Sequence, residues 1–290
     1  MALALTAVAK TNGTARNGSA GLRDLEIALL LEGVNRLTGM EFRGYAPTLL
    51  KRRIAERVRA EDCNTIAGLL ERVLHDSEAL ERFVYGLTVH PTGFFKDPAF
   101  YAAIRARVVP HLRTYPFVRI WHVGCGTGEE TYTLATLLRE GGIYERCKIY
   151  ATDVSQSAIR AARQGRFNSE ALDAMGDAYK ESGGTEALEA YYNVEGGSGT
   201  FAPELGKNVI FAQHNVASEG SFNEFHLIVA RNLLSNYNMT LQSNVHSLFL
   251  ESLVRLGFLA LGSKETIKHS PHERAYEEVD AQERIFRRVR

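Results

Sequence analysis

The sequence predicts an α/β protein with a mostly parallel sheet, preceded by a small helical bundle. In residues 22–87 the apolar residues recur at helical spacing and no strand-like segment interrupts them. After about residue 98, short apolar strand-like runs alternate with helix-like segments. That alternation is typical of parallel strands joined by right-handed helical crossovers. The 290 residues are enough for two domains of ordinary size.

The composition is that of a soluble globular protein, with 45% apolar residues, 23% charged residues and a formal net charge of zero. This balance argues against a protein that coats nucleic acid. Cys63, Cys125 and Cys147 are far apart and form no CxxC pair, so we expect neither a disulfide framework nor a metal site. No apolar run reaches the roughly 18 residues of a membrane span. The apolar residues 2–9 lack the preceding positive charges of a signal peptide. We therefore expect a cytoplasmic protein.

The predicted elements divide the chain into three parts. Residues 1–21, rich in Gly, Asn, Thr and Ser in their second half, are expected to be a disordered tail. Residues 22–90 are expected to form the helical domain and residues 91–290 the α/β domain. The expected strands are residues 118–123, 148–152, 209–211, 225–230 and 258–261, and the expected helices are residues 130–138, 156–163 and 239–254. The pattern weakens and becomes glycine-rich between about residues 165 and 208, which indicates an inserted piece.

The glycine cluster of residues 124–130, GCGTGEE, lies between the first expected strand and its helix. Gly124 and Gly126 let the backbone turn tightly and let a ligand approach it. A dinucleotide-binding loop has its third glycine one residue later, where Glu129 stands. Glu129 and Glu130 at the start of the helix would repel a pyrophosphate. A cofactor with an amine and a sulfonium but no phosphate suits this loop better, and S-adenosylmethionine is such a cofactor.

Asp153 ends the next expected strand. A carboxylate at that position can accept hydrogen bonds from ribose hydroxyls, as in other nucleotide-binding α/β folds. It could also cap the N-terminus of the following helix, and the two roles are compatible.

Six segments, in order, resemble the CheR-type chemotaxis receptor methyltransferases. Residues 92–97, TGFFKD, look like the family's T-x-F-F-R-[DE], and residues 121–132, WHVGCGTGEETY, are similar to W-x-A-G-C-S-T-G-E-E-P-Y. Further resemblances are carried by ATD at 151–153, HNV at 214–216, ARNL at 230–233, and LGFL with GSKE at 256–265. The resemblance extends from about residue 22 to the end.

The resemblance implies a helical N-terminal domain followed by a Rossmann-like class I methyltransferase domain. A small antiparallel β subdomain would be inserted at about residues 165–208. It also implies transfer of a methyl group from S-adenosylmethionine to glutamate side chains on cytoplasmic helices of a chemoreceptor-like protein. Together with the glycine loop it gives the expected cofactor contacts: His90, Thr92, Lys96, Gly124, Gly126, Glu130 with Glu129 as its substitute, Asp153, Asn215, Val216, Arg231 and Asn232.

Simpler interpretations of three of these residues stay open. Thr92 and Asn215 could cap turns, and Arg231 could be a solvated residue at the end of a strand.

The chain departs from the family pattern at three positions. It has His90 where the family has asparagine, Lys96 where the family has arginine, and Asn236 where the family has tyrosine, with Tyr237 one residue later. The family's arginine and tyrosine lie beside the methyl acceptor. Lys96, Asn236 and Tyr237 are therefore the expected catalytic residues, although lysine does not reproduce the bidentate geometry of arginine.

The implied reaction makes few chemical demands, because a glutamate carboxylate is already a nucleophile at neutral pH. Catalysis would depend on proximity and in-line orientation. Loss of orienting residues could slow transfer, or could mark a sensor or scaffold that binds the cofactor without turnover. A small-molecule methyltransferase is a third hypothesis, because fold does not determine substrate.

Residues 51–59 predict an amphipathic basic helix, on which Arg52, Arg53, Arg57 and Arg59 form two adjoining rows. The resemblance implies that this helical domain faces acidic receptor helices, which would steer association. A solvated charged face is the alternative. The short, glycine-rich residues 191–205 argue against tethering to a receptor peptide by strand addition. We expect a monomer.

Overall fold

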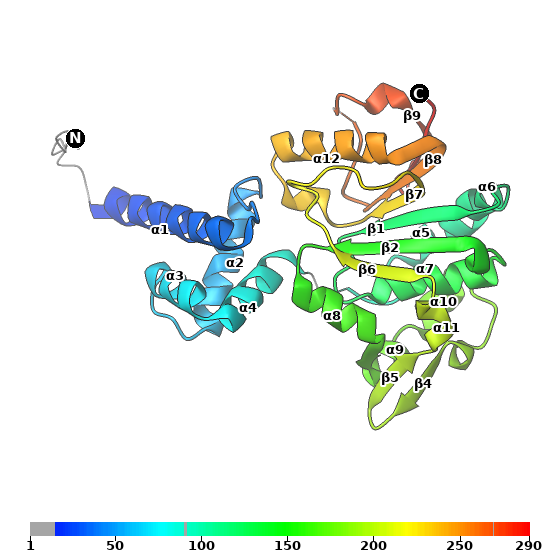
Figure 1. Cartoon of the computed structure of the whole chain (residues 1–290), viewed down its shortest axis with the longest axis horizontal. Coiled ribbons are helices and arrows are strands. Elements are labelled where there is room, and N and C mark those ends of the chain that lie inside the picture. Colours follow the sequence, from blue (N-terminus) through cyan, green and yellow to red (C-terminus); the bar gives the residue numbers. More distant parts are fainter. Residues whose placement is uncertain (1–14, 90–91, 269) are drawn as a thin grey trace.

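The computed structural model describes residues 15–89, 92–268 and 270–290 (Figure 1). The helical part consists of α1 (Ala15–Thr38), α2 (Pro47–Ala60), α3 (Ile66–His75) and α4 (Ser77–Thr88). Local chemistry fixes several of these boundaries: Pro47 occupies the first turn of α2, while the side chains of Thr65 and Asp76 accept backbone N–H groups at the starts of α3 and α4. The expected tail of residues 1–21 is partly wrong, because α1 begins at Ala15. The remainder of that range, residues 1–14, lies outside the described residues.

A seven-stranded sheet forms the centre of the second part, in the order β6-β2-β1-β7-β8-β10-β9. Its strands are β1 (Val118–Val123), β2 (Cys147–Asp153), β6 (Val209–Gln213), β7 (Phe225–Ala230), β8 (Leu253–Leu261), β9 (Tyr276–Asp280) and β10 (Ile285–Arg288). The first five strands in spatial order are parallel, and β10 and β9 are antiparallel to their neighbours. The α/β prediction is confirmed, but the C-terminal hairpin was not predicted.

The chain changes direction in the sheet beside β1. It runs outward from β1 through β2 to β6, and then returns to place β7 on the other side of β1. A crevice forms outside the carboxyl ends of the strands at such a switch point, and ligands bind there in open α/β sheets. The expected glycine loop follows β1 directly, so it lies at this point.

Helices cover both faces of the sheet (Figure 1). The helices α7 (Glu129–Glu140) and α8 (Gln156–Gln164) lie on one face and α12 (Met239–Ser252) on the other. Strand periodicity divides the apolar residues of β1 between two cores: Ile120 packs on the side of α7, and Trp121 on the side of α12. The second core continues into α1–α4. Before β1, the chain forms α5 (Pro98–Ala103), a π-helical segment (Ile104–Val108) and α6 (Val109–Leu112).

The piece between α8 and β6 contains a small antiparallel sheet of order β3-β5-β4. Its strands are β3 (Arg166–Asn168), β4 (Tyr192–Glu195) and β5 (Ser198–Phe201), and its helices are α9 (Ser169–Asp173), α10 (Gly176–Glu181) and α11 (Pro203–Gly206). Gly196 and Gly197 form the hairpin turn, where both φ angles are positive. Phe201 stacks on Tyr132 of α7 with ring centroids 4.8 Å apart, which holds this sheet against the main fold. In the part of the chain that is described, no helix is both long and apolar enough to cross a membrane.

Candidate cofactor and acceptor site

A pocket lies at the carboxyl ends of β1, β2, β6 and β7. The loops that follow these strands form most of its wall, and the rest comes from α4, the residues after it and the loop between α1 and α2. Its lining residues are Tyr45, Thr88, Val89, Thr92, Val123, Gly124, Cys125, Gly126, Glu130, Asp153, Val154, His214, Asn215, Val216, Arg231, Asn232, Leu233, Asn236 and Tyr237. Most of the predicted site residues are therefore brought together.

The glycine loop turns into the pocket with left-handed backbone at Gly124 (φ 70°) and Gly126 (φ 53°). The amide nitrogen of Gly124 donates to the oxygen of Thr152 at 2.8 Å, so the loop is attached to the end of β2. A Cβ at Gly124 or Gly126 would point to where the nearest atoms outside the loop are 3.5 Å and 3.8 Å away. The two glycines leave bare backbone facing the space that a ligand would enter.

Gly128 has a different task from the other two glycines. It has φ 101°, and a Cβ there would lie 3.0 Å from the Cβ of Ala162 in α8. The third glycine of the loop therefore allows α7 and α8 to pack closely.

Asp153 is buried at the end of β2 and holds the loops on either side of it. One carboxylate oxygen accepts the amide of Gly126 at 3.0 Å, and the other accepts the amide of Ser155 at 2.8 Å. The N-cap of α8 is Ser155, so the interpretation of Asp153 as that cap is wrong. Burial raises the pKa of Asp153, against the opposing effect of these hydrogen bonds. A carboxylate has about four acceptor positions, so Asp153 can also accept from a hydroxyl donor.

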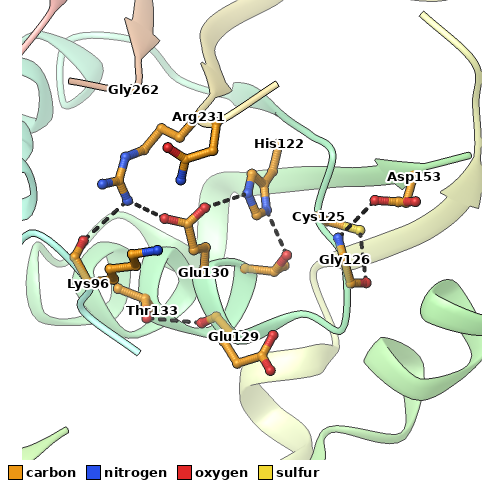
Figure 2. A network of polar contacts seen from close by, with 12 residues as sticks. Lys96, His122, Cys125, Gly126, Glu129, Glu130, Thr133, Asp153, Arg231 and Gly262 are labelled. Atoms are coloured by element: carbon orange, nitrogen blue, oxygen red, sulfur yellow. Dashed lines mark hydrogen bonds and ion pairs between the residues drawn. The ribbon is translucent and has the colours of Figure 1, made fainter. Parts of the chain in front are cut away.

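Glu130 of α7 and Arg231, the residue after β7, form a buried ion pair (Figure 2), and both residues line the pocket. The hydroxyl of Tyr101 donates to the Glu130 carboxylate at 2.9 Å, and a ring nitrogen of His122 lies 3.7 Å from it. Arg231 also pairs with Asp97. The side chain of Arg231 is only 2% exposed, so the interpretation as a solvated strand-end residue is wrong.

The environment of Glu130 keeps it ionised. Burial alone would raise the pKa of this carboxyl group. The positive charge of Arg231 and the contacts with His122 and Tyr101 outweigh burial, and the pKa falls to about 2. The lining of the pocket thus includes a compensated ion pair and the carboxylate of Asp153. A cationic ligand suits this arrangement better than a phosphate does.

Thr92 and His214 present polar atoms that have no hydrogen-bond partner among the residues that the structure describes. The hydroxyl of Thr92 and Nδ1 of His214 are buried and unpaired, and both residues line the pocket. Buried polar groups are normally satisfied, so these two atoms indicate a polar ligand. Thr92 does not cap a turn with this hydroxyl. Asn215 does cap one, because its side-chain oxygen accepts the amide of Ala217 at 3.0 Å, and it lines the pocket as well.

The loop after β7 is shaped by Glu265, which sequence reasoning missed as a site residue. Its buried carboxylate accepts the amides of Asn232 and Ser235, both at 3.1 Å, and that of Gly262 at 2.8 Å. Asn232 is held with φ 56°. The GSKE segment contained the signal for Glu265, but nothing in it indicated that the carboxylate would organise a different loop.

Two models of known protein families match this chain and together cover most of it. Residues 90–285 match the model described as CheR methyltransferase, SAM binding domain, and residues 25–88 match CheR methyltransferase, all-alpha domain. The chain belongs to the CheR methyltransferase family. Its cofactor is S-adenosylmethionine, as expected from the glycine loop.

Named relatives cover most of this CheR-family chain. A Pseudomonas putida protein named Cher3 is 39% identical over 91% of this chain and 97% of its own length. A Listeria monocytogenes protein named Chemotaxis protein methyltransferase is 25% identical over 81% of this chain and 87% of its own. Chemotaxis protein methyltransferase 1 of Pseudomonas aeruginosa is 25% identical over 77% of this chain and 83% of its own.

Two predicted site residues of this CheR-family chain, Lys96 and Glu129, do not line the pocket, and a third cannot be placed. His90 lies outside the described residues. Lys96 is exposed and absent from the pocket lining. The guanidinium of Arg231 donates to the backbone oxygen of Lys96 at 3.2 Å. Glu129 points away from the pocket (Figure 2), and its carboxylate accepts the hydroxyl of Thr127. Glu130 therefore needs no substitute.

Asn236 and Tyr237 both line the pocket, but their side chains make different contacts. The side-chain amide of Asn236 donates to the backbone oxygen of Asn232 at 2.8 Å. Tyr237 instead meets Tyr45, with ring centroids 5.0 Å apart. Tyr45 was missed, because no local pattern distinguishes it from an ordinary residue before a helix.

The predicted basic rows on α2 are partly wrong. Arg53 is buried, and its guanidinium donates to the backbone oxygen of Leu87. Arg57 is largely buried and pairs with the buried carboxylate of Glu61 at 2.8 Å. Arg52 and Arg59 are exposed. Spacing alone predicts an amphipathic helix but does not show which face packs on α4. That face includes two of the four arginines, Arg53 and Arg57.

Proposed function

We propose that this chain transfers the methyl group of S-adenosylmethionine to glutamate side chains on the cytoplasmic helices of a chemoreceptor-like protein. The observation that carries the proposal is a single pocket that combines cofactor-type contacts with two buried tyrosines, Tyr45 and Tyr237, in a CheR-family chain. The names of the Listeria and Pseudomonas aeruginosa relatives, which are chemotaxis protein methyltransferases, support the choice of acceptor.

The cofactor would be held by residues of the glycine loop and of the neighbouring strand ends. Asp153 suits the ribose hydroxyls, because its carboxylate keeps free acceptor positions. The unpaired hydroxyl of Thr92 suits a polar atom of the cofactor. When bound, S-adenosylmethionine supplies a methyl group activated by a sulfonium. The ionised carboxylate of Glu130, which lines the pocket, favours that positive charge.

The protein's remaining task is to orient the acceptor. A glutamate carboxylate is ionised at neutral pH and needs no general base. Correct placement of reacting atoms can supply a large part of the rate enhancement. The exposed residues Arg52 and Arg59 on α2 offer positive charge to acidic receptor helices.

The test is incubation of the full chain with methyl-labelled S-adenosylmethionine and cytoplasmic fragments of several chemoreceptors. Base-labile label on glutamates, located by peptide mass spectrometry, is the expected result. Heat-denatured enzyme is the control. Turnover of small metabolites with no labelling of any receptor fragment would replace this proposal with small-molecule methylation.

A second candidate is a sensor or scaffold that binds the cofactor without turnover. It is favoured by the exposure of Lys96 and by the amide of Asn236, which is engaged with Asn232. This candidate requires tight S-adenosylhomocysteine binding in calorimetry together with no methyl esters. Measurable ester formation removes it.

A further inference from the structure

The loop between α1 and α2 contributes a buried tyrosine to a pocket that otherwise belongs mainly to the methyltransferase part. Tyr45 is 7% exposed and lines the pocket opposite the glycine loop, beside Asn236 and Tyr237. The helical part of the chain therefore supplies a wall of the site as well as an outer surface.

This tyrosine is held in place by backbone contacts on both sides. The amide of Ala46 donates to the oxygen of Asn236, and the amide of Asn238 donates to the oxygen of Gly44, both at 2.8 Å. These bonds form an antiparallel bridge between Tyr45 and Tyr237. Gly44 allows the close approach, because a Cβ there would lie 2.7 Å from Cδ2 of Leu241. The bridge fixes the register of the two rings.

The two rings meet edge to face, with centroids 5.0 Å apart and an interplanar angle of 75°. Burial raises the pKa of both tyrosines, so both stay neutral at physiological pH. Each neutral phenol carries one hydroxyl hydrogen, and two hydroxyls can use at most one of these hydrogens between themselves. The pair therefore keeps one hydrogen with which to donate to a ligand in the pocket.

We propose that Tyr45 is an acceptor-binding residue, which together with Tyr237 donates a hydrogen bond to the carboxylate that receives the methyl group. This inference rests on the proposed function. Lys96 does not line the pocket, and the side-chain amide of Asn236 donates to the backbone oxygen of Asn232.

Physical chemistry favours a neutral donor at this position. A carboxylate that enters a buried pocket loses water and needs a replacement donor. A phenol orients one oxygen and leaves the other free to attack. A hydroxyl also compensates less of the negative charge than an arginine would, so the carboxylate keeps more of its nucleophilic character.

The test compares Tyr45→Phe, Tyr237→Phe and the double variant with Tyr115→Phe as the matched control. Tyr115 packs edge-on against His226 at the opposite end of β1, far from the pocket lining. For each variant we would measure kcat and KM for a receptor fragment, the Kd of S-adenosylhomocysteine by calorimetry, and the urea midpoint.

We expect Tyr45→Phe to lower kcat/KM about 10- to 100-fold, the effect of one lost hydrogen bond to a charged group. The Kd of S-adenosylhomocysteine and the urea midpoint should stay close to those of the wild type. The double variant should lose less than the product of the single losses, because the two hydroxyls act as a unit. Tyr115→Phe should match the wild type.

The outcomes separate the two proposals. If the wild type forms methyl esters and Tyr45→Phe keeps kcat/KM within about threefold, the inference on Tyr45 is overturned and the proposed function stands. If cofactor affinity falls in parallel with activity, Tyr45 has only a structural role, which also overturns the inference. If the wild type labels no receptor fragment, the proposed function fails and the acceptor role fails with it.

Discussion

The carboxylate of Glu130 and the guanidinium of Arg231 form an ion pair in the lining of the pocket, with both side chains less than a tenth exposed. The pair connects the first turn of α7 to the end of β7. Those two elements adjoin the glycine loop and the loop after β7, so the ion pair links two walls of the pocket. Arg231 also lies over the ring of Phe100, 4.4 Å from its centroid, which ties the pair to α5.

Replacing Arg231 with methionine should strongly destabilise the fold, because Glu130 would be left as an uncompensated buried charge. Breaking a buried pair from one side costs about 3–5 kcal/mol. The free energy of unfolding in urea measures this loss. The double variant Arg231→Met/Glu130→Gln should recover much of it. If the single and double variants lose the same free energy of unfolding, the uncompensated charge of Glu130 is not the cause of the destabilisation.

The stability contributed by Glu130 should depend on pH in a defined direction. Its pKa is about 2 in the fold, below the usual glutamate pKa of 4.5. A lowered pKa stabilises the fold above the unfolded-state value, and this contribution disappears as pH falls from about 5 towards 2. Its size is roughly 3 kcal/mol. The difference in unfolding free energy between wild type and Glu130→Gln, followed across this range, isolates the effect. A difference independent of pH would contradict it.

Asp153→Asn should weaken binding of S-adenosylhomocysteine by about 10- to 100-fold, the effect of losing hydrogen bonds to a charged acceptor. The amide would also place a donor next to the amides of Gly126 and Ser155, which now donate to the carboxylate. Calorimetric titration gives the Kd. Asp173→Asn, at an exposed carboxylate in α9, is the control and should bind normally.

Gly128→Ala should reduce stability by about 2–4 kcal/mol, from the cost of a left-handed backbone and of overpacking. The added Cβ would lie 3.0 Å from Cβ of Ala162, so α7 and α8 would have to separate. Gly176→Ala is the matched control, since a Cβ there meets nothing within 4 Å. It should change the urea midpoint little. Similar results for the two variants would remove the packing explanation of the third glycine.

Lys96→Ala should leave the Kd of S-adenosylhomocysteine within about twofold of the wild-type value, the range of an exposed substitution. The Lys96 group that contacts Arg231 is the backbone oxygen, which alanine retains. Calorimetry on both proteins makes the comparison. A tenfold loss would place the lysine side chain on the cofactor after all.

Much of the site could be predicted because its residues stand next to features with a strong local signature. Gly124 and Gly126 lie just after β1, and Asp153 is the last residue of β2. Both strands have clear apolar runs in the sequence. The C-terminal hairpin was missed for a related reason. Its edge strand β9 is rich in charged residues and mostly not buried, so it lacks the apolar run by which the other strands were found.

The sequence by itself determined the α/β fold, the glycine loop and the choice of cofactor, because each depends on periodicity or on residues adjacent in the chain. Only the tertiary structure decided that Arg53 is buried, that Glu265 holds the loop after β7, and that Tyr45 meets Tyr237. Each of these contacts joins segments far apart in the chain. Their formation depends on how whole elements pack, and a local pattern of residues contains no information about that packing.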